Sequence, residues 1–240
     1  MKKEINKSKK LGILGGMGSQ ATQYFFKKVI EKTDAKKDQD HINMIILNHA
    51  SIPDRTEAIL SGNHEEFLSL ISEDMKIFEK YGAEHVAIPC NTSHYFYKEI
   101  QAMTKIPVIN MVEETIKSIS QNKDRIVKRV GILATDGTIL TKIYEKECSK
   151  RGIEAVIPSE KSQKDIMSII YDEIKSGKEG DCEKFMRVVE ELRSKRCDVI
   201  VLACTELSYL KENNDLPEYC VDALEILAEK SVELSGKKLK

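Results

Sequence analysis

The segment CDVIVLACTELSY at residues 197–209 decides the fold that the sequence predicts. Its apolar run, DVIVLA at residues 198–203, is short and ends at a cysteine followed by a threonine, a pattern typical of a buried strand that leads into a helix. A second segment, AEHVAIPCNTSHY at residues 83–95, has the same organisation. Its apolar run ends at Cys90, 114 residues before Cys204.

A second similarity links the two halves of the chain. Gly12-Ile13-Leu14 followed by Gly18 recurs, with the same spacing, 119 residues later as Gly131-Ile132-Leu133 followed by Gly137. Because both similarities occur in the same order with nearly the same offset, we interpret the chain as two repeats. Short apolar runs also alternate with helical patterns, which predicts the α/β class with parallel sheets. The expected strands are LGIL (11–14), INMIIL (42–47), HVAI (85–88), VGIL (130–133), EAVI (154–157) and DVIVLA (198–203).

The chain is long enough for one large domain or two small ones. Amphipathic patterns predict helices over 64–81 and 180–194, and no Gly/Pro-rich linker interrupts the chain. Residues 221–234 show a helical pattern without a strand of its own and are expected to pack back on the first half. The predicted domains are therefore residues 1–110 together with 218–240, and residues 111–217.

Composition and charge exclude several partners. Hydrophobic residues make up 41% and charged residues 32%, and 38 Lys and Arg balance 39 Asp and Glu for a net charge of −1. Such a chain has no global field that would attract nucleic acid or a membrane surface. The polar N-terminus lacks a signal sequence, and no apolar run reaches the length of a membrane span. We therefore expect a cytoplasmic protein whose six cysteines are reduced.

Cys90 and Cys204 are the candidate reactive residues. Each is expected at a helix N-terminus, where the helix dipole favours the thiolate and lowers the thiol pKa. The carboxyl end of a strand, where each cysteine lies, is also where open α/β sheets bind ligands. Two repeats that face each other would therefore place both thiols at one cleft. A disulfide is disfavoured by the compartment, and zinc would have Cys90, His94 and Cys204 but no fourth ligand. A third use is acid/base chemistry, in which one thiolate removes a proton from carbon and the opposite thiol returns one to the other face.

The glycine turn LGILGGMGSQAT at residues 11–22 is a weak dinucleotide signal. It fits G-x-G-x-x-A, but the second strand ends in Asn48-His49, with no acidic residue for a ribose. The same glycines allow backbone N–H groups to approach a small carboxylate.

Two cations are candidates for binding carboxylates. Arg55 follows a proline turn near the end of a strand, where a guanidinium could hold a carboxylate through two hydrogen bonds. Lys175 ends a helical pattern, a position where lysine usually serves the helix dipole. His94, one helical turn after Cys90, either tunes that thiol or is a buried hydrogen-bonded residue, while His41, His64 and His85 are expected to be surface or core residues.

At these residues the sequence resembles the aspartate/glutamate racemase family of cofactor-independent amino-acid racemases, and most of all its aspartate racemase branch. The similarity spans nearly the whole chain through GGMGSQAT, SIPDRT, IPCNTSH, LATDGT, IYDEIKSG and LACTE. The resemblance implies two pseudosymmetric α/β domains with the active site in the cleft between them, a homodimer, and neither pyridoxal phosphate nor metal. It assigns acid/base catalysis to Cys90 and Cys204 and carboxylate binding to Arg55 and Lys175. It places at the ligand pocket Met17, Asn91, Thr92, Thr135, Thr138 and Thr205.

The resulting hypothesis is a racemase that interconverts L- and D-aspartate, with glutamate as a further substrate. Two cations favour a dicarboxylic amino acid, because one would suffice for a neutral side chain. The alternatives are a hydantoin racemase, a maleate isomerase, or a non-catalytic protein that binds a small ligand on the same paired repeats.

Overall fold

The computed structural model describes residues 8–122 and 125–240 and contains two parallel sheets. The first sheet has the order β2-β1-β3 and the second the order β5-β4-β6-β7. The strands are β1 (Leu11–Gly15), β2 (Met44–Asn48), β3 (His85–Ala87), β4 (Arg129–Leu133), β5 (Glu154–Val156), β6 (Val199–Leu202) and β7 (Cys220–Asp222). The predicted α/β class and all six predicted strands are confirmed.

The two sheets repeat one topology. β1 and β4 take equivalent central positions, with β2 and β5 on one side and β3 and β6 on the other. In the first sheet a single parallel bridge between Val86 and Val108 lies where β7 lies in the second. The repeat inferred from the glycine and cysteine segments is therefore a structural repeat.

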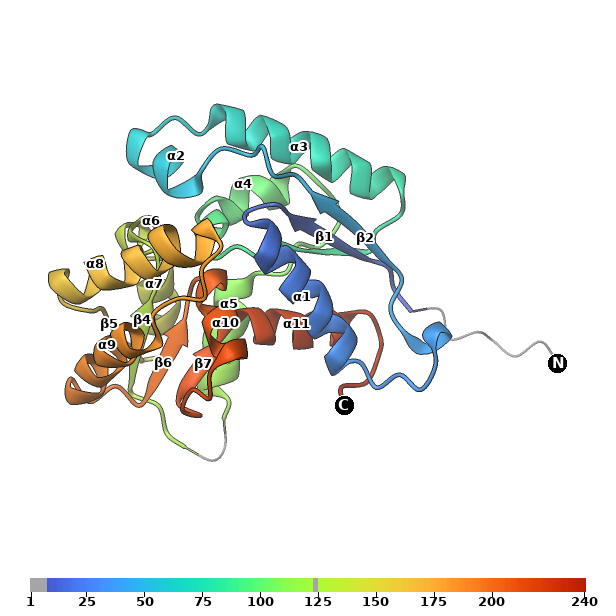
Figure 1. The fold of residues 1–240 in the computed structure, drawn as a ribbon. Coiled ribbons are helices and arrows are strands. Elements are labelled where there is room, and N and C mark those ends of the chain that lie inside the picture. The colour runs from blue at the N-terminus through green and yellow to red at the C-terminus, as the bar shows by residue number, and fades with distance from the viewer. Residues whose placement is uncertain (1–7, 123–124) are drawn as a thin grey trace.

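Helices cover both faces of each sheet, as Figure 1 shows. The predicted helices over 64–81 and 180–194 are α3 and α9. The α-helices are α1 (Ser19–Lys32), α2 (Arg55–Ser61), α3 (Glu65–Lys80), α4 (Tyr97–Ala102), α5 (Met111–Ser120), α6 (Asp136–Thr141), α7 (Ile143–Ser149), α8 (Glu160–Ser168), α9 (Cys182–Ser194), α10 (Thr205–Asn213) and α11 (Ala223–Leu234). Within the described part of the chain, no helix combines the length and apolar content needed to cross a bilayer.

One apolar core joins the two halves. Alternate side chains of the central strands, such as Ile13 in β1 and Ile132 in β4, pack in the same buried cluster with residues of α1, α5, α7 and α11. The intervening side chains face two outer clusters: Leu14 packs beneath α3 and α4, and Leu133 packs beneath α8 and α9. Period-2 alternation on strands covered on both faces produces this division.

The paired glycines Gly12 and Gly131 have a packing role. A Cβ at Gly12 would lie 2.7 Å from the ring of Phe78 in α3, and one at Gly131 would lie 2.8 Å from Leu192 in α9. Glycine at equivalent positions of the central strands therefore lets the outer helix approach each sheet closely.

The C-terminal segment differs from its prediction in one respect. Cys220–Asp222 form β7 on β6, so the expectation that no strand precedes the last helix is wrong. α11 then packs against both α1 of the first half and α5. The domain division at residues 111 and 218 stays a proposal. It assigns β7 to the first domain, although β7 pairs with β6 of the second sheet.

Asp222 is a fully buried carboxyl at the junction of β7 and α11. Its Oδ1 accepts hydrogen bonds from the Ser208 hydroxyl at 2.7 Å and the Leu224 amide at 2.8 Å. Its Oδ2 has no partner among residues 8–122 and 125–240. Burial raises the pKa of Asp222 from the usual 3.8 to about 6.

We expect Asp222→Asn to change the pH dependence of stability. A raised folded-state pKa contributes stability that is present below pH 3.8 and lost as the pH rises through about 6. The unfolding free energy of the variant relative to wild type should therefore increase between pH 4 and 7.5, by up to about 3 kcal/mol for a shift from 3.8 to about 6. Urea unfolding at several pH values measures it, with exposed Asp215→Asn as the control. A pH-independent difference would contradict the assignment.

Candidate active site

The carboxyl ends of the strands from both halves meet at one cavity. Its volume of about 10 Å³ is close to the roughly 10–15 Å³ that one water needs, so the site is closed. The cavity is lined by Met17, Asp54, Arg55, Thr56, Cys90, Asn91, Thr92, Thr135, Tyr171, Lys175, Cys204, Thr205 and Glu206. The structure therefore brings together both candidate thiols, both candidate cations and five of the six other predicted pocket residues. Thr138 lies behind this lining.

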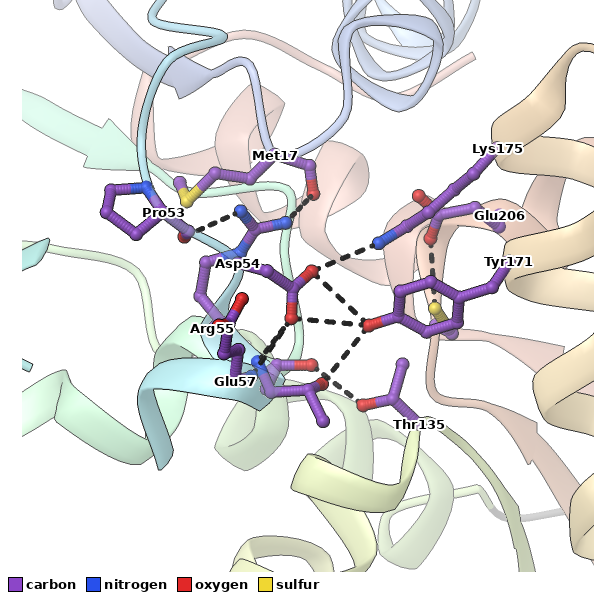
Figure 2. A network of polar contacts seen from close by, with 12 residues as sticks. Met17, Pro53, Asp54, Arg55, Glu57, Thr135, Tyr171, Lys175 and Glu206 are labelled. Atoms are coloured by element: carbon purple, nitrogen blue, oxygen red, sulfur yellow. Dashed lines mark hydrogen bonds and ion pairs between the residues drawn. The ribbon is translucent and has the colours of Figure 1, made fainter. Parts of the chain in front are cut away.

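Cys90 follows β3 and lies beside a buried cation. The Arg55 guanidinium donates to the carbonyl oxygens of Pro53 at 3.0 Å and Met17 at 3.2 Å (Figure 2). Burial opposes the charge of Arg55, but Cys90 and Asp54 outweigh it and raise the Arg55 pKa. Because the Arg55 guanidinium is near Cys90, a thiolate at this position would have a permanent positive neighbour.

The local structure after Cys90 differs from the prediction. Cys90 precedes the 3₁₀ turn η2 (Thr92–Phe96), which leads into α4, instead of an α-helix that starts at once. Cys204 does cap a helix, since it is the N-cap residue of α10.

Cys204 has an anionic neighbour. Its Sγ donates to Oε2 of Glu206 at 2.9 Å, and both side chains are buried. Burial raises the pKa of Cys204 well above its usual value, and the Glu206 carboxylate raises it further, while Lys175 opposes the shift. The expectation that the helix N-terminus lowers the pKa of this thiol is therefore wrong. Cys204 is a protonated thiol at neutral pH.

Hydroxyl and amide groups connect the two halves behind the thiols. Thr92 Oγ1 contacts the hydroxyls of Thr135 at 3.1 Å and Thr138 at 2.9 Å, so Thr138 orients Thr92 from behind the lining. Asn91 accepts a hydrogen bond from the Tyr144 hydroxyl through Oδ1. The Asn91 Nδ2 group is buried without a partner in the described part of the chain, which leaves a donor for a ligand.

The cavity is closed by contacts between Asp54 in the first half and two residues of the second half. Asp54 Oδ2 lies 3.5 Å from Lys175 Nζ and 3.3 Å from the Tyr171 hydroxyl (Figure 2). Tyr171 lies in the π-helical turn η3 (Ile169–Glu173), and Lys175 lies in the 3₁₀ turn η4 (Ile174–Ser176) that follows it. Close approach of α6 to α2 supports the closure, since a Cβ on Gly137 would lie 2.9 Å from Thr56 Oγ1.

The charges that line the cavity balance. Arg55 and Lys175 supply two positive charges, and Asp54 and Glu206 supply two negative ones. Burial opposes the charge of Lys175, but Glu206, Tyr171, Cys204 and Asp54 together raise its pKa. Both cations therefore remain charged, and each has an anionic neighbour before any ligand binds.

The other candidates of the sequence lie outside the cavity. The remaining cysteines are buried or half-buried elsewhere, and no disulfide forms among the described residues, which include all six cysteines. Burial lowers the pKa of His94, so its neutral ring donates to one of two nearby carbonyls, that of Cys90 at 2.9 Å or that of Ile109 at 3.2 Å. Across residues 8–122 and 125–240, no three His, Cys, Asp or Glu side chains are grouped to hold a metal ion.

Sequence reasoning missed four residues of the cavity, namely Asp54, Thr56, Tyr171 and Glu206. Each belongs to a motif that was singled out for another residue: SIPDRT for Arg55, IYDEIKSG for Lys175 and LACTE for Cys204. The signal that could have identified them was a polar side chain in the same motif as a candidate residue.

Comparisons with known proteins agree with this geometry. Residues 14–230 match the family described as Asp/Glu/hydantoin racemase. The broad specificity amino-acid racemase RacX of Bacillus subtilis is 30% identical over 226 residues, which cover 92% of this chain and 96% of that protein.

Solved structures have the same fold. The aspartate racemase of Picrophilus torridus superposes with a TM-score of 0.83 at 31% identity, covering 97% of this chain and 96% of that one. An aspartate racemase homologue from Pyrococcus horikoshii OT3 has a TM-score of 0.75 at 24% identity, covering 95% of this chain and 100% of the other, and supports the fold alone. The family match covers most of this chain, and two strand-end thiols line one cavity. This chain therefore belongs to the Asp/Glu/hydantoin racemase family.

Proposed function

We propose that the protein interconverts the L and D forms of an α-amino acid by proton transfer at Cα between Cys90 and Cys204. One observation carries the proposal: thiols from equivalent ends of two repeated strands line a single closed cavity. An acid and a base on opposite sides of one carbon are what inversion of a stereocentre requires.

The neighbours of the two thiols support a starting state. Cys90 beside Arg55 is the thiolate that removes the α-proton, and Cys204 beside Glu206 is the thiol that donates a proton to the opposite face. The C–H bond breaks as the Cys90 S–H bond forms, and the Cys204 S–H bond breaks as the new C–H bond forms. Afterwards Cys204 is a thiolate beside a carboxylate, and this like-charge contact favours its reprotonation.

The negative charge that develops on the substrate carboxylate needs preorganised donors. The Asn91 amide, which has no partner in the described part of the chain, and the N-terminus of α10 are at the cavity, and the Thr205 hydroxyl is held by Glu206 Oε2 at 3.4 Å. Exclusion of water from so small a cavity strengthens these interactions.

For the substrate, we propose aspartate first, with glutamate next. The presence of both Arg55 and Lys175 at the cavity and the 31% identity to an aspartate racemase support this choice. A broader set of amino acids is the second candidate, because Lys175 is already paired with Asp54 and the relative RacX has broad specificity. The homodimer and the cytoplasmic location stay predictions.

Replacement of either thiol tests the assignment. Cys90→Ala and Cys204→Ala should each lower kcat for aspartate racemisation by about 10²- to 10⁴-fold, the usual contribution of a general acid or base. Chiral chromatography measures the products over a panel of amino acids, a hydantoin and maleate. Cys182→Ala, outside the cavity, is the control and should stay active. A fully active Cys204→Ala protein would refute the two-base assignment, and turnover of only the hydantoin or maleate would favour those alternatives.

Glu206→Gln should lower the apparent pKa of Cys204, because it removes a like charge while keeping the shape of the side chain. Alkylation rates of the Cys204 peptide as a function of pH, followed by mass spectrometry, measure the change. Cys182 in the same sample is the internal control. An unchanged Cys204 profile would show that burial alone holds the proton.

A further inference from the structure

Asp54 has two separate tasks at the edge of the cavity. Its Oδ1 accepts the amide N–H groups of Thr56 at 2.9 Å and Glu57 at 3.1 Å, so it is the N-cap of α2. This pairing fixes the carboxylate to the first half and would be met equally well by an asparagine oxygen.

The other oxygen of Asp54 faces the second half. Oδ2 forms the ion pair with Lys175, whose Nζ also lies 4.0 Å from the centre of the Tyr171 ring. The Tyr171 hydroxyl contacts both Asp54 and Thr56. Figure 2 shows Asp54 between Arg55 on one side and Lys175 and Tyr171 on the other.

The same contact lies between the closed cavity and an outer hollow. A hollow of about 640 Å³ shares Asp54, Thr56 and Tyr171 with the cavity and is also lined by Leu60 and Met167. Since an amino acid does not fit in about 10 Å³, the site must widen to admit one, and widening at this boundary separates Asp54 from Lys175. A side chain longer than that of aspartate would extend past Asp54 into this hollow.

We propose that Asp54 is a specificity-determining residue, which reduces the preference of the site for a carboxylate side chain relative to a neutral or cationic one. The inference rests on the proposed racemase function. A side-chain carboxylate must displace Asp54 from Lys175 or lie beside a like charge, whereas an ammonium side chain gains Asp54 as a partner.

Asp54→Asn tests the inference, because it keeps the helix cap and removes the charge. The ratio of kcat/KM for aspartate to kcat/KM for lysine should rise at least about tenfold in this variant. Glu66→Gln is the matched control, since it removes a negative charge from an exposed side chain of α3 that lines neither the cavity nor the hollow and should leave the ratio within about twofold. Tyr171→Phe keeps the ring beside Lys175 and the charge of Asp54, so the ratio should again change little.

Succinate binding separates this inference from the proposed function, because succinate binds without turnover. By calorimetry its Kd should fall about tenfold in Asp54→Asn and stay unchanged in Glu66→Gln. Failure of the wild type to racemise any amino acid would refute the proposed function, while the succinate result would still decide the role of Asp54. An unchanged aspartate-to-lysine ratio and unchanged succinate affinity in Asp54→Asn, or equal changes in both variants, would overturn the inference.

Discussion

The apolar core shared by the two sheets is the constraint on which the site depends. Side chains of β1 and β4 pack in one cluster with helices from both halves, so the sheets cannot be placed independently. The carboxyl ends of both sets of strands consequently meet at one cavity. A strand-end cysteine that alone would be a small buried side chain becomes half of a pair by this arrangement.

Repetition of the backbone does not make the two thiols chemically equal. Cys90 lies beside a guanidinium, and Cys204 lies beside a carboxylate to which it donates its proton. A reaction that needs one base and one acid benefits from such neighbours, because a nearby cation favours a thiolate and a nearby carboxylate favours a thiol. The contact of Asp54 with Lys175 also affects substrate binding, because Asp54 competes with a substrate carboxylate for this cation.

The sequence predicted the fold well because the repeat involves strand-end glycines and cysteines whose spacing is preserved. It failed for β7, because Val221 in this strand continues into the helical pattern of residues 221–234. It also failed for the pKa of Cys204, because the helix terminus is a local feature whereas complete burial and the orientation of Glu206 arise only in the folded chain.

The sequence also could not predict which charged residues of the two halves form ion pairs with each other. Lys175 forms an ion pair with Asp54, which is 121 residues earlier in the sequence. An anionic neighbour of this kind determines whether the lysine is free to bind a substrate carboxylate. Thr138 was expected to help shape the ligand pocket, and its hydroxyl contacts that of Thr92 in the lining. Sequence spacing alone does not distinguish a residue that lines the cavity from one that supports the lining.

Hydrogen isotope transfer during turnover tests the central claim most directly. The protein is given enantiomerically pure aspartate in D₂O, and both enantiomers are isolated at low conversion for mass spectrometry. Two thiols on opposite faces predict that the product carries solvent deuterium at Cα while the remaining substrate keeps its hydrogen. Product that retains the substrate's own α-hydrogen would require a single base, and would contradict the assignment of Cys90 and Cys204 to opposite sides of the substrate.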